Sequence, residues 1–339
     1  MRDVAIVSYA HLTVPRSEQD DVEMLAPVVA KAIEASGVPK KEIGFTVSGS
    51  CDYLGGRPFS FVMALDAIGA WPPIAESHVE MDGAWALYEA WVRLQCGDID
   101  SALVYAFGRS SQGDLRDVMV TQLDPYYLAP LAPDWIGLAA LQARALLDTG
   151  RCTEKDLAEI AAERRGKGAK ASDLMKAPYV VAPLREHDCP PSFDGASAVV
   201  LVAGEKAKKV CQNPAWIRGI DHRIEAHSLG ARDLTRSVST KLAGQKAGVV
   251  GQKVDIAEIH APFSHQEIIL KDALGIDAGV KVNPSGGALA AHPFIVAGLN
   301  RFGEAASRIH DGTARSAIAH ATSGPCLQQN MVCLLAGSR

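Results

Sequence analysis

The sequence lacks several patterns that would assign its 339 residues to a common protein class. It has no GxGxxG motif after its first apolar segment, no P-loop and no GxSxG motif. These absences disfavour a nicotinamide-dependent enzyme, a P-loop nucleotidase and an α/β-hydrolase. The seven cysteines show no CxxC pair and no metal-ligand spacing. We therefore expect reduced thiols, a cytoplasmic protein and no metal site.

The sequence also lacks a basic excess and a long hydrophobic run. Its formal net charge of -5 gives no general attraction for nucleic acid. No apolar stretch is long enough to span a bilayer, and the N-terminal segment MRDVAIVSYAHLTVP predicts a first strand rather than a signal peptide. With 48% hydrophobic and 22% charged residues, the composition is that of a soluble protein with about two domain-sized units.

What the chain does contain is a regular alternation of strand and helix signals, which predicts an α/β architecture with a buried sheet. It also contains a weak internal duplication. Residues 32–50 resemble 244–262, residues 79–94 resemble 282–299, and residues 101–108 resemble 316–324, in the same order. Three ordered matches favour two halves of one ancestral unit over a chance similarity of apolar blocks.

The order of these blocks resembles the thiolase superfamily over essentially the whole chain. The segments that carry the resemblance are ALQARALLDTGRCTEKDLAEIAAERR (140–165), CPPSFDGASAVVLV (189–202), HAPFSHQE (260–267), NPSGGALAAHP (283–293) and TSGPCLQQN (322–330). HAPFSHQE is similar to the His-Asp-x-Phe segment of the sterol-carrier-protein branch. The whole pattern looks most like the actinobacterial lipid-transfer-protein group of thiolase-like proteins, some of which act in steroid side-chain degradation.

The resemblance implies a five-layered αβαβα thiolase fold built from two homologous halves. We expect residues 1–214 to form the N-terminal half, with a loop domain at about 109–191, and residues 215–339 to form the C-terminal half. It further implies a CoA thioester as substrate, no bound cofactor, and a dimer or dimer of dimers. Some relatives work with a second thiolase-like subunit and a small OB-fold, zinc-containing protein.

The sequence departs from the family where the acylated cysteine normally stands, three residues before the glycine that opens a helix. The matching glycine is Gly83, and the residue three positions before it is Glu80. A carboxylate is a poor acyl carrier but a natural general base or acid, and a dry pocket would raise its pKa. Capping of the following helix is an equally good reading of Glu80, and Asp82 has the stronger claim to pure capping.

The remaining site residues follow from the resemblance. His260 is expected to help form an oxyanion site, His292 to polarise the thioester carbonyl, and Cys326 to exchange the Cα proton. Asn283 is expected to hold a water molecule or a backbone turn. Gly286 and Gly287 allow close approach of a CoA substrate, although a tight turn explains them equally well. His265 and His320 are interpreted as structural.

These residues predict an enzyme that cleaves a C–C bond in an acyl-CoA. A retro-aldol cleavage of a β-hydroxyacyl-CoA, with a steroid or lipid side chain, needs no acyl-cysteine. Its base and oxyanion donors could come from Glu80, His260, His292 and Cys326. Two alternatives remain: a non-catalytic thiolase-like subunit of a hetero-complex, and an acetyl-CoA acetyltransferase or thiolase. The aromatic residues Phe59, Phe61, Trp71, Trp85 and Tyr88 could line an apolar tunnel, but the core is their expected place.

Overall fold

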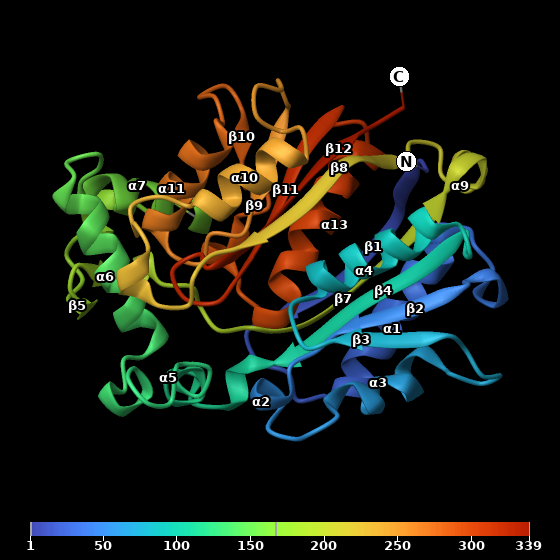
Figure 1. Cartoon of the computed structure of the whole chain (residues 1–339), viewed down its shortest axis with the longest axis horizontal. Helices are drawn as coiled ribbons and strands as arrows, with labels where there is room; N and C mark the ends of the chain where they lie inside the picture. Colours follow the sequence, from blue (N-terminus) through green and yellow to red (C-terminus); the bar gives the residue numbers. More distant parts are fainter. Residues whose placement is uncertain (1, 167, 339) are drawn as a thin grey trace.

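The protein is described here from a computed structural model, which describes residues 2–166 and 168–338. Its main sheet is shown in Figure 1. Across the described residues its strands run in the order β10 (Lys281–Val282), β9 (Ile256–Ile259), β11 (Ser316–Ser323), β12 (Gln329–Ala336), β8 (Ala215–Ile224), β1 (Val4–Val14), β7 (Asp194–Ala203), β4 (Ser101–Arg109), β2 (Phe45–Gly49) and β3 (Glu76–Val79).

The sheet consists of two parts with the same strand arrangement. In the N-terminal part, β3, β2 and β4 are parallel neighbours, and β7 and β1 follow antiparallel. In the C-terminal part, β10, β9 and β11 are parallel, and β12 and β8 follow antiparallel. Within the sheet, the described residues pair the two parts at Ala5 with Trp216 and at Ile6 with Ala215, between β1 and β8. This repeated order agrees with the sequence repeats; the division at residue 214 stays a prediction.

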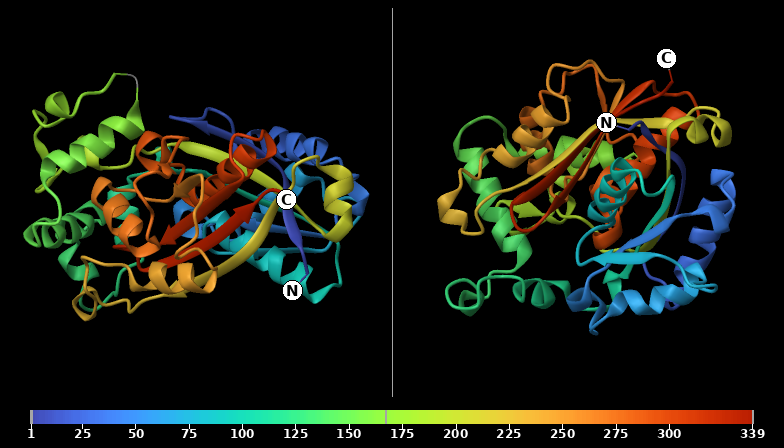
Figure 2. Two further views of the ribbon diagram at one scale, coloured as in Figure 1. Left: turned by 90° about the horizontal axis from the view of Figure 1, so that it is seen from above. Right: turned by 45° about the vertical axis from the view of Figure 1, so that its right-hand side comes forward.

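Helices fill the space between the two parts and cover their outer faces, which gives five layers (Figures 1 and 2). The central layer holds α4 (Gly83–Cys96) and α13 (Ala297–His310). The outer layers hold α1 (Asp21–Ser36) and α3 (Ser60–Ile68) on one side, and α10 (Val238–Lys246) and α11 (Ser264–Leu274) on the other. The α/β thiolase architecture expected from the sequence is therefore confirmed.

The strand sequences explain why both faces of each sheet are covered. On β4, Ala102, Val104 and Ala106 pack into the central layer. Leu103, Tyr105 and Phe107 alternate with them and pack against the outer helices. Because successive side chains of a strand point to opposite faces, such an unbroken apolar run requires helices on both sides.

The remaining elements connect the layers. They are α2 (Asp52–Gly55), α5 (Leu115–Val120), α6 (Trp135–Asp148), α7 (Glu154–Arg165), α8 (Ala171–Leu174), β5 (Tyr179–Val181), β6 (Leu184–Arg185), α9 (Gly204–Val210) and α12 (Gly287–Ala290). Helix α7 begins after Thr153, whose side chain forms a capping box with Asp156. In the described part of the chain, no helix is both long and apolar enough to cross a membrane.

The expectation that the listed aromatic residues lie in the core is wrong for two of them. Phe59 is 68% exposed and Trp71 is 85% exposed, whereas Trp85 is buried in the central layer. Phe59 and Trp71 lie just outside the two ends of α3, so they are not part of the helix face that is buried. None of the five aromatic residues lines the cavity described below.

Candidate active site

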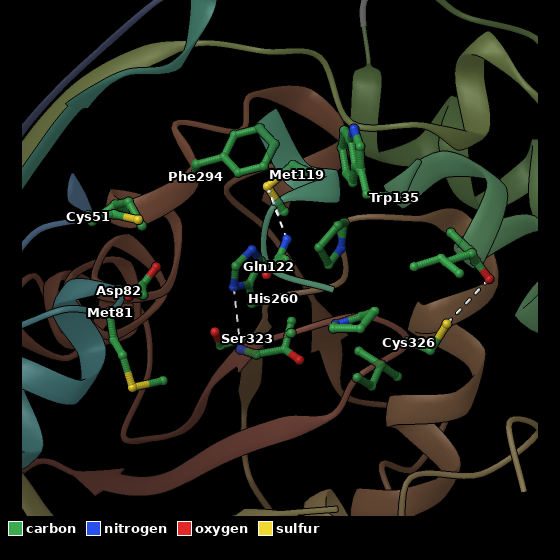
Figure 3. A pocket seen from close by; sticks show the side chains of 18 of the residues that line it. Cys51, Met81, Asp82, Met119, Gln122, Trp135, His260, Phe294, Ser323 and Cys326 are labelled. Atoms are coloured by element: carbon green, nitrogen blue, oxygen red, sulfur yellow. Dashed lines mark hydrogen bonds between the residues drawn. The ribbon is translucent and has the colours of Figure 1, made fainter. Parts of the chain in front are cut away.

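A cavity of about 150 Å³ lies between the two halves (Figure 3). The N-terminal half contributes Cys51, Glu80, Met81 and Asp82 to its wall, and α6 contributes Trp135, Leu138 and Ala139. From the C-terminal half come His260, Phe263, His292, Phe294, Thr322 and Cys326. The four predicted catalytic residues, Glu80, His260, His292 and Cys326, therefore line one cavity, although they are far apart in sequence.

His260 and His292 are in direct contact in this cavity. Their Nε2 atoms are 2.9 Å apart, and both side chains are buried. His260 directly follows β9, whose last residue is held by Asn283: the Asn283 side-chain oxygen accepts a hydrogen bond from the Ile259 N–H at 2.7 Å. Asn283 thereby fixes the end of the strand from which His260 projects.

The hydrogen bonds define which nitrogen of each ring carries the proton. The backbone N–H of Thr322 donates to His260 Nδ1 at 3.4 Å, so in the neutral ring the proton is on Nε2. His260 Nε2–H then donates to His292 Nε2, which places the His292 proton on Nδ1. Among the described residues His292 Nδ1 has no hydrogen-bond partner, although it is buried. The pair therefore keeps one buried N–H donor that no described group accepts.

Burial keeps both rings neutral. It lowers the pKa of His292 to about 3, with a smaller effect from the positive charge of Arg301. The pKa of His260 is lowered well below its ordinary value by burial and by its histidine neighbours. At neutral pH the pair therefore offers N–H dipoles rather than a positive charge to a developing oxyanion.

Cys326 lies in the turn between β11 and β12, on the α6 side of the cavity. Its thiol donates a hydrogen bond to the Leu138 carbonyl at 3.3 Å and points toward α6 in Figure 3. Its own carbonyl accepts from Gln142 at 3.3 Å and from Arg232 at 3.1 Å, which holds the turn in its positive-φ conformation. Burial raises the pKa of Cys326 to about 12, so the thiol is protonated at neutral pH.

Glu80 differs from the expected buried carboxylate. Its side chain lines the cavity but the residue is exposed, and it accepts a hydrogen bond from the Asp52 N–H at the start of α2. The expectation of a dry environment for Glu80 is therefore wrong, because the segment from Glu76 to Glu80 runs along the exposed β3 edge of the sheet. Glu80 caps α2, not the α4 helix that follows it in the sequence.

Asp82 is the cap of α4, as expected, and it also caps a second helix. Its carboxylate accepts hydrogen bonds from the N–H groups of Ala84 at 2.8 Å, Gly298 at 2.7 Å and Leu299 at 3.0 Å. The first belongs to α4 and the other two to the first turn of α13. The sequence predicts the local cap, whereas the bond to α13 joins positions more than two hundred residues apart and leaves no local signal.

Cys51 is a cavity residue that the sequence reasoning missed. It follows β2 and is 7% exposed, and Figure 3 places it on the wall opposite Cys326. Burial, with a smaller effect from the Glu80 carboxylate, raises its pKa to about 12. One signal was present: the carboxyl ends of parallel strands meet at one edge of a sheet, so the residues that follow β2, Cys51 among them, could have been placed near the start of α4.

Asn283, Gly286 and Gly287 do not line this cavity. Gly286 and Gly287 both have positive φ, and a Cβ on Gly287 would lie 2.8 Å from the Asn283 amide nitrogen, so the pair forms a tight turn. Their role in CoA binding stays a prediction. His265 and His320 are buried outside the cavity and contact Gln142 and Asn330, respectively, as their structural reading expects.

Comparison with known proteins gives a consistent picture. Residues 231–333 match the family model described as "Thiolase, C-terminal domain". The chain is 25% identical to an acetyl-CoA acetyltransferase of Methanocaldococcus jannaschii, with 90% of this chain and 89% of the relative covered. It is 24% identical to the benzoylsuccinyl-CoA thiolase subunit BbsB of Thauera aromatica, covering 57% of this chain and 61% of the relative.

Two solved structures have the same fold. The Ltp2-ChsH2(DUF35) aldolase superposes with a TM-score of 0.83 at 17% identity, covering 99% of this chain and 98% of the other. Human mitochondrial 3-ketoacyl-CoA thiolase in complex with CoA superposes with a TM-score of 0.78 at 15% identity, covering 100% and 98%. The chain is therefore similar in sequence to the C-terminal domain of thiolases and to enzymes named as acting on CoA thioesters, and it has the thiolase fold.

Proposed function

We propose that the chain acts on CoA thioesters and cleaves the Cα–Cβ bond of a β-hydroxyacyl-CoA by a retro-aldol reaction. The observation that carries the proposal is the neutral His260–His292 pair in a cavity that has Glu80 where thiolases carry the acylated cysteine. The sequence relatives are named as enzymes of CoA thioesters, and one structural neighbour is named an aldolase.

The reaction needs a base for the β-hydroxyl proton, a hydrogen-bond donor for the enolate oxygen and an acid that protonates Cα. A base takes the β-hydroxyl proton, the C–O bond becomes a carbonyl, and the Cα–Cβ electrons move into the thioester to form an enolate. An N–H of the His260–His292 pair, whose two residues line the cavity, donates to the enolate oxygen once the substrate replaces the bond between the two Nε2 atoms. An acid then protonates Cα, which releases an aldehyde or ketone and a shortened acyl-CoA. One such oxyanion donor is worth about 10²–10³ in rate.

The structure offers groups for both proton transfers on opposite walls. We assign the base to Glu80, which shares its wall with Cys51, and the Cα acid to the protonated thiol of Cys326. Figure 3 shows Cys51 and Cys326 on opposite sides of the cavity, with His260 between them. Cys326 must turn away from the Leu138 carbonyl to reach a substrate.

The test is product analysis with purified protein and a β-hydroxyacyl-CoA. We expect a shortened acyl-CoA and a carbonyl product, and we expect His292→Ala to lower kcat about 10²–10³-fold. Replacing the exposed His227 by alanine is the matched control and should leave kcat unchanged. Full activity of His292→Ala would contradict the assignment.

Acyl transfer through an enzyme thioester is the second candidate. It is favoured by the relatives named acetyl-CoA acetyltransferases and by the Cys51 thiol in the cavity wall. With their pKa values raised to about 12, Cys51 and Cys326 carry little thiolate at neutral pH, which disfavours acylation. An acyl adduct on Cys51 or Cys326, mapped by mass spectrometry after incubation with acetyl-CoA, would establish this alternative and exclude the retro-aldol proposal.

A partner subunit stays part of the proposal. The exposed Phe59, Val62, Met63 and Trp71 lie on or beside α3, and would suit a contact with a second copy or a second thiolase-like subunit. The small OB-fold partner and the steroid or lipid side chain rest on the family resemblance, and the cytoplasmic location rests on the cysteine pattern. Cleavage that requires a thiolase-like partner and survives His292→Ala would identify the chain as a non-catalytic subunit.

A further inference from the structure

A second cavity of about 280 Å³ adjoins the candidate active site on the side of the N-terminal half. The two cavities share the wall residues Cys51, Tyr53, Leu54 and Ile295. We call the second cavity the side chamber. A cavity of this volume can hold an acyl group of several carbons beyond the thioester.

The wall of the side chamber contains an unpaired buried hydroxyl. Ser50 is 1% exposed and lies immediately before the shared residue Cys51. Its Oγ has no hydrogen-bond partner among the described residues. A buried hydroxyl without a hydrogen-bond partner destabilises the unliganded protein. A ligand oxygen that forms a hydrogen bond with it removes this cost, which favours binding.

The charges at the chamber wall are already paired. Asp21 and Arg109 both line it, and Arg109 Nε donates to the Asp21 carboxylate at 3.1 Å. The same carboxylate also accepts from Arg57. Each of these charged groups therefore already has a partner, whereas the Ser50 hydroxyl has none. A hydroxyl or keto oxygen is the kind of group that a neutral hydroxyl pairs with.

We propose that the side chamber binds the acyl group of the substrate, and that this acyl group carries a hydroxyl or keto oxygen which pairs with Ser50. This inference rests on the proposed action on CoA thioesters and specifies its substrate class: oxygenated acyl chains of medium length, rather than plain saturated ones. Ser50 acts as a specificity residue and takes no part in bond cleavage.

Two glycines of the chamber wall allow the cavity to be filled without disturbing the backbone. Gly108 is on β4, and a Cβ there would meet nothing within 4 Å; the same is true of Gly113, whose φ is −110°. Gly108→Leu should therefore occupy chamber space, and Gly113→Val provides a second variant if the first folds poorly. Gly230 is an exposed glycine outside both cavities with equally open surroundings, so Gly230→Leu is the matched control.

The experiment measures binding of unreactive CoA analogues by titration calorimetry. The probes are carba(dethia) analogues of acetyl-CoA and hexanoyl-CoA, and hexanoyl analogues with a hydroxyl on carbon 4, 5 or 6; a methylene replaces the thioester sulfur, so the probes are neither hydrolysed nor lactonised. We expect at least one hydroxylated analogue to bind the wild-type protein about three- to tenfold more tightly than the hexanoyl analogue, the effect of one neutral hydrogen bond.

The variants separate the possible outcomes. Ser50→Ala should abolish the preference for the hydroxylated probe, and Gly108→Leu should weaken hexanoyl binding about tenfold while acetyl-analogue and CoA binding stay unchanged. An absent preference, a preference that survives Ser50→Ala, or equal weakening of acetyl and hexanoyl probes by Gly108→Leu would overturn the chamber assignment alone. Failure of the wild-type protein to bind CoA or any analogue would instead overturn the proposed action on CoA thioesters, and the inference with it.

Discussion

Replacing Asp82 by asparagine would change how the stability of the protein depends on pH. Asp82 is 5% exposed, and burial raises its pKa to about 7 despite the three N–H groups that it accepts. A carboxyl group that holds its proton more tightly in the folded than in the unfolded chain stabilises the fold when protonated. Its contribution is complete below about pH 4 and is lost as the pH rises through 7.

The magnitude follows from the two pKa values. With about 7 in the folded state and about 3.9 in the unfolded state, ionisation of this one group should cost about 2.5 kcal/mol between pH 5 and pH 8. Asparagine does not titrate, so the free energy of unfolding of the wild type should fall by about 2.5 kcal/mol relative to Asp82→Asn over this range.

The assay is urea unfolding of both proteins at pH 5, 6, 7 and 8. The buried histidines, whose pKa values are lowered, contribute stability that is present above about pH 6.5 and lost as the pH falls; this opposite trend is common to both proteins and cancels in the difference. Asp311→Asn is the control, because hydrogen bonding by Thr313 lowers the Asp311 pKa and the residue should not titrate in this range. A difference that stays constant within about 0.5 kcal/mol would refute the reasoning.

Three further predictions concern other parts of the structure. Iodoacetamide at neutral pH should alkylate the exposed Cys96 at least about tenfold faster than Cys51 and Cys326, whose burial and raised pKa keep them as thiols; equal rates in peptide mapping by mass spectrometry would contradict this. Arg164→Met should lower the free energy of unfolding by about 3–5 kcal/mol, because it leaves Glu267 buried without its two 2.8 Å hydrogen bonds; a loss under about 1 kcal/mol in urea unfolding would speak against it. Asp82→Ala should lower the free energy of unfolding by about 3–5 kcal/mol in the same assay, because the N-termini of α4 and α13 both lose their hydrogen-bond acceptor. A loss of only about 1 kcal/mol, as for a single exposed N-cap, would contradict the double cap.

The sequence predicted those features that depend on local pattern. The cap of α4 by Asp82 follows from residues within one helical turn. The recurrence of one strand arrangement in both halves was also predictable, because three sequence blocks repeat in the same order.

Features that depend on contacts between distant segments were not predicted from local pattern. Cys51 reaches the cavity because β2 ends beside the start of α4: a Cβ on Gly49 would lie 2.5 Å from the Gly83 Cα. The exposure of Glu80 follows from the edge position of β3, which no periodicity records. The family motif placed His260, His292 and Cys326 correctly in one cavity, but the orientation of the Cys326 thiol toward Leu138 is set by α6, from another part of the chain.

The junction between β1 and β8 has a mechanical consequence. It consists of the pairs Ala5↔Trp216 and Ile6↔Ala215, whereas the cavity residues follow the opposite, carboxyl ends of β2, β9 and β11. The two walls that carry Cys51 and Cys326 are therefore not held together by strand pairing at the cavity. They are held by the central layer, where side chains of both parts and of α4 and α13 form one core. The Asp82 carboxylate adds a polar link between α4 and α13 in this layer.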